Sequence, residues 1–275
     1  ALIRFLDYRF YTPYTQVLDT SEGLPFAKWC VGGTTNVVLN CIDRWRGTPR
    51  YTQPALVWEG EDGTQVTRTF EGIDRETCEL AWGLRQLGLG RGDVVGMYLP
   101  NLPQAAAAML AVAKIGAIVL PMFSGFGADA IAQRLQDGRA KAVITVDGSL
   151  RRGKPMSAKP VLDEALKHCP DVQHVVVTGL GDLIGWWKGR FVNFAVRHLR
   201  KMVPEYRLPL DGGRTVTRWR QALDEGRGRA HAEEQRAGDR DPEGSASDRL
   251  HRPRDHLGGG GGEDQPEQRR DLGLC

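Results

Sequence analysis

The sequence lacks several patterns that would place it in a special class of protein. No CxxC pair occurs among its five cysteines (Cys30, Cys41, Cys78, Cys169 and Cys275), so neither a disulfide framework nor a zinc site is indicated. No window approaches the roughly 18 consecutive apolar residues of a membrane-spanning helix, and no basic segment followed by an apolar run opens the chain. We therefore expect a cytoplasmic protein without a membrane span. The 275 residues are 41% hydrophobic and 26% charged with a net charge of +3, as in ordinary globular proteins.

The last 50 residues entirely lack several residue types, most of them large and apolar. Residues 226–275 contain no Val, Ile, Phe, Tyr, Trp, Met or Lys, whereas Arg, Asp and Glu fill 20 positions and Gly fills 10. Such a composition cannot build a hydrophobic core. We therefore predict a folded unit over residues 1–225 and a low-complexity tail over residues 226–275.

The folded unit alternates short apolar runs with helix-period runs, which predicts an α/β fold with a largely parallel sheet. A hairpin is expected at Ala55–Gly60 and Val66–Phe70. Further strands are expected at Val94–Leu99, Ala117–Met122, Lys141–Val146 and Val172–Thr178. Helices are expected around Ile73–Leu87, Leu102–Ile115, Ala128–Leu135 and Leu162–Cys169.

Three segments carry candidate chemistry, and each also has a plain structural interpretation. Residues 147–154 place a glycine and clustered Arg and Lys just beyond a predicted strand, where open α/β sheets bind ligands, but the same letters describe a solvated basic loop. The loop Ser124–Gly127 has the same placement and could be an ordinary turn. Trp186–Lys201 carries five positive charges and no acid, which is typical of a polyanion-binding or membrane-binding helix and also of a surface helix.

The order of the segments, together with their letters, resembles the N-terminal part of the AMP-forming acetyl-CoA and short-chain acyl-CoA synthetases of the adenylate-forming superfamily. The likeness runs over roughly residues 10–225. The segments that carry it are Lys28–Gly33, Asn36, Asn40–Arg44, Trp58–Glu61, Gly92–Val95, Leu99–Pro100, Ala113–Ala117, Phe123–Phe126, Ala140–Thr145 and Arg151–Lys154. The expected fold is therefore the N-terminal part of the large synthetase domain followed by a disordered tail.

This resemblance implies a two-step ligase. A carboxylate attacks the α-phosphate of ATP to give acyl-AMP and pyrophosphate, and the thiol of CoA then displaces AMP. The family's basic motif contacts the phosphate-bearing end of CoA and carries over to Arg151, Arg152, Gly153 and Lys154; Gly125 is a further CoA-binding candidate. Lys154 stands where the family often has Arg, which keeps the charge but loses the two-pronged donor. No catalytic residue and no metal ligand is assigned.

The phosphate loop that the resemblance leads one to expect, Thr-Ser-Gly-Thr-Thr-Gly-x-Pro-Lys-Gly, does not occur in the 275 residues. We therefore expect that the ATP and Mg sites of the full-length family are missing here, and that this chain holds only part of the CoA site and is inactive alone. Its expected partners are CoA and a short-chain carboxylate, without nucleic acid, and the oligomeric state stays open. The alternatives are a non-enzymatic CoA-binding or nucleotide-binding module, or a polyanion or membrane-surface binder that uses Trp186–Lys201.

The tail has two interpretations. Back-translating Gly244–His256 and reading one nucleotide later allows Asp-Pro-Leu-Leu-Ile-Ala-Tyr-Thr and then Gly-Thr-Thr, which is close to the family's approach to its phosphate loop. A reading frame lost between about Gly226 and Gly244 would explain this fit. The other interpretation is a genuine disordered, charge-rich tail.

Overall fold

The computed structural model describes residues 2–61, 63–151, 154–156, 158–179 and 214–227. Its centre is a five-stranded parallel sheet in the order β11 (Thr215–Arg218), β10 (His174–Thr178), β7 (Ala142–Val146), β5 (Val94–Tyr98) and β6 (Ile118–Met122). Every residue of β7 is buried, as expected for a central parallel strand covered on both faces. The predicted α/β fold with a largely parallel sheet is confirmed.

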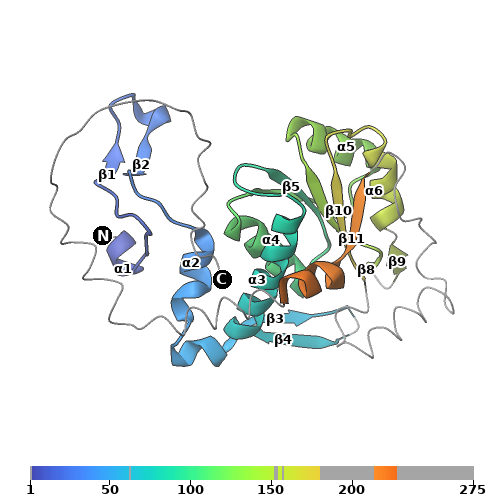
Figure 1. The fold of residues 1–275 in the computed structure, drawn as a ribbon, viewed down its shortest axis with the longest axis horizontal. Coiled ribbons are helices and arrows are strands. Elements are labelled where there is room, and N and C mark those ends of the chain that lie inside the picture. Colours follow the sequence, from blue (N-terminus) through green and yellow to red (C-terminus); the bar gives the residue numbers. More distant parts are fainter. Residues whose placement is uncertain (1, 62, 152–153, 157, 180–213, 228–275) are drawn as a thin grey trace, which may run out of the picture.

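Helices cover both faces of the sheet, so the described chain has three layers (Figure 1). On one face, α3 (Phe70–Gln86), α4 (Pro103–Lys114) and the helix over residues 219–227 share a core with β5, β7 and β10. On the other face, α5 (Ala128–Asp137) and α6 (Ala158–Leu166) pack through Ile131, Leu135, Leu162 and Leu166. The two cores cover both faces of the sheet, and the loops that follow its strands lie at its carboxyl edge.

The segments before α3 form short elements. They are α1 (Leu2–Phe5), β1 (Gln16–Asp19), η1 (Leu24–Phe26), β2 (Lys28–Val31), α2 (Val37–Cys41), η2 (Asp43–Trp45), η3 (Pro49–Thr52), β3 (Pro54–Glu59) and β4 (Gln65–Thr69). The strands β1 and β2 pair antiparallel, and so do β3 and β4. The second pair is the hairpin that the sequence predicts.

Buried polar contacts join these segments to the helices. Lys114, whose side chain is 1% exposed, donates to Asp43 Oδ1 at 2.8 Å. Arg46 donates from Nε and Nη2 to the two carboxylate oxygens of Asp74 at 2.5 and 2.6 Å, and the Tyr51 hydroxyl donates to Asp74 Oδ2 at 2.8 Å. Because Asp74 is only 2% exposed, this carboxylate fixes two N-terminal side chains to α3.

Three features differ from the sequence-based expectations or extend them. The sequence predicts a polar loop after β7, but residues 147–156 contain the antiparallel hairpin of β8 (Ser149–Arg151) and β9 (Lys154–Met156). The β1–β2 hairpin has no counterpart among the predicted elements, because Val17, Leu18 and Trp29 are 46%, 38% and 69% exposed and give no buried pattern to recognise. A helix over residues 219–227 begins at Trp219 and follows β11, and neither element is among those that the sequence periodicity predicts.

Two predictions lie outside the described residues, namely the basic segment Trp186–Lys201 and the tail beyond residue 227. Among the helices that the structure describes, none has the length and apolar character required to span a bilayer.

Candidate functional site

The candidate site lies at the carboxyl edge of the parallel sheet. β7 ends at Val146 and leads through Asp147 and Gly148 into the β8–β9 hairpin, in which the backbones of Arg151 and Lys154 are register partners. Arg152 and Gly153, which link the two strands, lie outside the described residues. The other candidate, Gly125, lies in the connection from β6 to α5 and therefore leaves the same edge. Only β5 separates β6 from β7 in the sheet, so the structure brings the two candidate segments to one edge.

The loop over residues 123–127 is tightly held on its inner side. The Tyr98 hydroxyl donates to the carbonyl oxygens of Ser124 and Phe126, at 3.0 and 3.2 Å. The Phe126 ring packs edge-on against Phe123, with centroids 5.7 Å apart, and the Arg134 guanidinium lies 4.2 Å from its centroid. Cation–π contacts occur within proteins as well as with bound ligands, and here the contact stabilises the loop. The residue between the two fixed carbonyls, Gly125, is exposed.

Buried polar groups line the ends of the central strands beneath this loop. Thr145 of β7 donates its hydroxyl to the Tyr98 carbonyl at 3.1 Å, and the amide of buried Asp147 donates to the Thr178 carbonyl at 3.0 Å. Burial raises the pKa of Tyr98, so its phenol stays protonated and remains a donor at neutral pH. The ends of β5, β7 and β10 are thus tied together at the carboxyl edge of the sheet.

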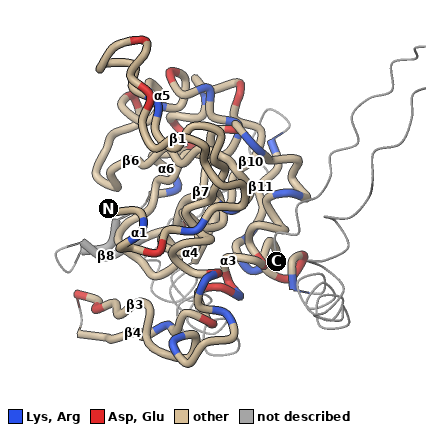
Figure 2. The backbone as a smooth tube through the Cα atoms, turned by 90° about the vertical axis from the view of Figure 1, so that its left-hand side faces the viewer, with Lys and Arg blue, Asp and Glu red and all other residues tan. Residues whose placement is uncertain are grey.

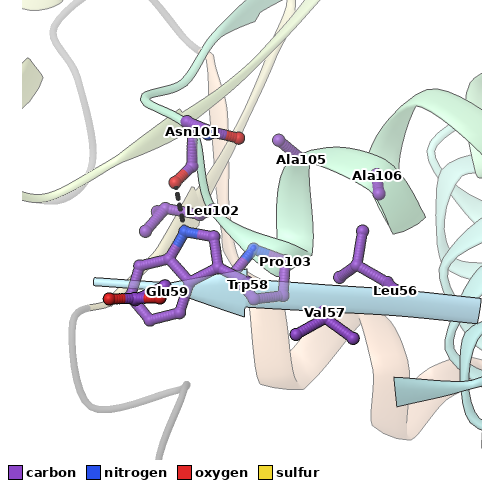
Figure 3. Close-up of a pocket in the computed structure, with 9 residues that line it drawn as sticks. All are labelled: Leu56, Val57, Trp58, Glu59, Asn101, Leu102, Pro103, Ala105 and Ala106. Carbon is purple, nitrogen blue, oxygen red and sulfur yellow. Dashed lines mark hydrogen bonds between the residues drawn. The ribbon is translucent and has the colours of Figure 1, made fainter. Parts of the chain in front are cut away.

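A pocket of about 200 Å³ lies next to this edge, between β3 and the start of α4 (Figure 3). Its lining residues are Leu56, Val57, Trp58, Glu59, Asn101, Leu102, Pro103, Ala105 and Ala106. The Trp58 indole donates from Nε1 to the Asn101 carbonyl at 2.7 Å, which fixes the β3–β4 hairpin against the end of β5. Most of the lining side chains are apolar, but Glu59, Asn101 and backbone groups make the exposed surface of the pocket largely polar, so the lining favours no particular ligand. Trp58 and Glu59 belong to a segment that carries the family resemblance, but no pattern in the sequence predicts a pocket there.

The charges of the described chain are mixed. In the view of Figure 2, Lys and Arg positions are interspersed with Asp and Glu positions along the described backbone. Among the described residues, no three His, Cys, Asp or Glu side chains gather in a group that could hold a metal ion.

Comparison with known proteins gives the family. Residues 43–205, more than half of the sequence, match the family described as AMP-binding enzyme, and residues 5–41 match the acetyl-coenzyme A synthetase N-terminus. The chain belongs to the AMP-binding enzyme family. The resemblance that the sequence motifs carry is confirmed by these two matches.

Individual relatives of this AMP-binding family member agree with the family matches. The chain is 46% identical over 183 residues to acetyl-coenzyme A synthetase from Mycobacterium bovis, which covers 65% of this chain and 28% of the relative. It is 40% identical over 209 residues to acetyl-coenzyme A synthetase from Gemmatimonas aurantiaca, which covers 71% of this chain and 30% of the relative. Acetoacetyl-CoA synthetase from Streptomyces lividans shares the fold with a TM-score of 0.63 and 28% identity, over 81% of this chain and 30% of that one. The chain therefore spans about 30% of the length of these relatives.

Proposed function

We propose that this chain is the N-terminal portion of an AMP-forming acyl-CoA synthetase and contributes part of its CoA site. In the whole enzyme, a short-chain carboxylate, ATP and CoA would give acyl-CoA, AMP and pyrophosphate through an acyl-adenylate. The observation that carries the proposal is the family match together with the position of its basic motif at the carboxyl edge of the sheet. Within this portion, residues 1–225 are assigned to the synthetase fold and residues 226–275 to the low-complexity tail, except that Gly226 and Arg227 still belong to the helix over residues 219–227.

The proposed CoA-binding residues are Arg151, Arg152, Gly153, Lys154 and Gly125. Arg and Lys supply charged donors to phosphate oxygens, and CoA carries phosphates at its nucleotide end. The backbone pairing of Arg151 with Lys154 supports a shared role, because two residues that pair in a tight hairpin remain close together. Gly125 lies in the exposed loop two strands away, which a nucleotide spanning the edge can reach.

Calorimetry with CoA tests this site. We expect the 275-residue chain to bind CoA and the Arg151→Ala variant to bind it about tenfold more weakly, because one charge-assisted hydrogen bond is lost. Arg91→Ala is the matched control, since Arg91 is exposed and precedes β5 at the opposite edge of the sheet. Equal affinities for the two variants, or no CoA binding by the parent chain, would contradict the assignment.

The 275 residues alone are proposed to lack ligase activity, because the phosphate loop of the family does not occur in their sequence. A pyrophosphate-release assay with acetate, ATP and CoA should therefore give no turnover with this chain. Turnover above the buffer control would show that the proposal of an inactive portion is wrong.

A further inference from the structure

Tyr98 occupies a junction between the two segments of the candidate site. It is the last residue of β5, the strand between β6 and β7, and it is 2% exposed. Its backbone carbonyl accepts from the Thr145 hydroxyl on β7, and its own hydroxyl donates to the carbonyls of Ser124 and Phe126 after β6. One residue therefore connects the strand that leads to Arg151 with the loop that contains Gly125.

The hydroxyl group of Tyr98 has no role in the hydrophobic core. The ring packs with Met122, Ile131 and Val143, and a phenylalanine would fill the same space. A buried hydroxyl is costly unless it is hydrogen-bonded, and here it donates to the two loop carbonyls. The hydroxyl therefore serves the conformation of the loop.

Fixing these two carbonyls also orients two amides. In a planar trans peptide, the carbonyl of one residue and the N–H of the next point in opposite directions. Because the Ser124 and Phe126 carbonyls point inward to Tyr98, the N–H groups of Gly125 and Gly127 point away from it. Both glycines are exposed, so no side chain of their own covers these amides. An acceptor group such as a phosphate oxygen would meet two oriented donors there.

We propose that Tyr98 is a positioning residue of the CoA site, which holds the loop over residues 123–127 so that the amides of Gly125 and Gly127 face the ligand. This inference rests on the proposed function for its ligand. The hold of Tyr98 on the loop is independent of that function and can be measured without any ligand.

The test compares Tyr98→Phe with Tyr51→Phe. Both substitutions remove one hydrogen-bonded hydroxyl, but Tyr51 donates to Asp74 on α3, away from the sheet edge. In Tyr98→Phe we expect the Phe126 amide, which donates to the Phe123 carbonyl within the loop at 3.0 Å, to exchange with deuterium about fivefold faster, as the loss of one hydrogen bond predicts. We expect a similar weakening of CoA binding by calorimetry. Tyr51→Phe should lower the melting temperature and leave both quantities unchanged.

The possible outcomes distinguish the positioning role of Tyr98 from the proposed binding of CoA. Unchanged exchange of the Phe126 amide in Tyr98→Phe, or the same acceleration in Tyr51→Phe, would overturn the positioning role. Faster exchange with unchanged CoA affinity would also overturn it, because the loop would then be held for another purpose. If the parent chain binds no CoA, the proposed function fails, and the exchange data still decide whether Tyr98 positions the loop.

Discussion

Gly83 lies where α3 crosses the helix over residues 219–227, and the crossing leaves no room for a side chain. A Cβ at position 83 would lie 2.4 Å from the Ala222 carbonyl oxygen, and a Cβ at Gly226 would lie 2.1 Å from the Glu79 carbonyl oxygen. Glu79 and Gly83 are four residues apart, as are Ala222 and Gly226, so each pair shares one helix face. The two backbones therefore meet directly at this crossing, and we predict that Gly83→Ala destabilises the fold.

The expected loss follows from two opposing contributions. Alanine is a better helix former than glycine, which favours the variant by about 1 kcal/mol. Overpacking costs about 3 kcal/mol, at the upper end of the usual range, because the obstructing atoms belong to the Ala222 backbone and cannot rotate away. The net loss of about 2 kcal/mol should lower the melting temperature of a domain of this size by about 5 °C.

Gly72→Ala on the same helix is the matched control. There the nearest atom to a new Cβ is the Thr69 hydroxyl oxygen at 3.4 Å, an ordinary contact, so the melting temperature should stay the same or rise. Thermal and urea unfolding followed by circular dichroism compare the two variants with the parent chain. The reasoning is refuted if Gly83→Ala melts with the parent, or if Gly72→Ala loses as much stability as Gly83→Ala.

Two further changes test acidic residues of α3, the buried Asp74 and the partly buried Glu76. Asp74→Asn should lower the free energy of unfolding, measured in urea, by about 2 kcal/mol, because Arg46 loses its charged partner. This loss is smaller than that for a fully buried ion pair, since the Arg46 side chain is 39% exposed. An unchanged urea midpoint would show that the ion pair contributes nothing to stability. The pKa of Glu76 is raised, mainly by burial, although Arg68 and a hydrogen bond from Trp219 act in the opposite direction. Since the folded-state pKa exceeds the unfolded value, ionised Glu76 opposes folding, and stability should rise as the pH falls from 7 towards 4.5. Glu76→Gln should raise the melting temperature at pH 7 and reduce this pH dependence, and a lower melting temperature at pH 7 would contradict the argument.

Much of the fold was predictable because burial leaves a pattern in the letters. The run Ala142–Val146 is almost entirely apolar, since a parallel strand that is covered on both faces needs no polar side. The helical spacing of Ile73, Leu80 and Leu84 reports the single face of α3 that packs inward. The β8–β9 hairpin was not predicted, because strands of three residues with mixed polar and apolar side chains are too short to give a periodic signal.

The candidate site was predictable only in part. Its basic motif and Gly125 could be located from their positions after predicted strands. In contrast, the sequence around Tyr98 predicts only another residue of a buried strand. The two carbonyl groups to which its hydroxyl donates are 26 and 28 residues away in the chain, so no local pattern indicates the contact. The pocket beside Trp58 joins residues from β3 and α4 that share no sequence pattern.

The sequence by itself determined the fold class, the family and the segments that carry its motifs, because periodic burial and ordered motifs are local properties of the chain. Only the tertiary structure decided that β5 lies between the two candidate segments, that Tyr98 joins them and that Gly83 permits the helix crossing. These are contacts between distant residues, and their distances depend on how the whole sheet and its helices pack.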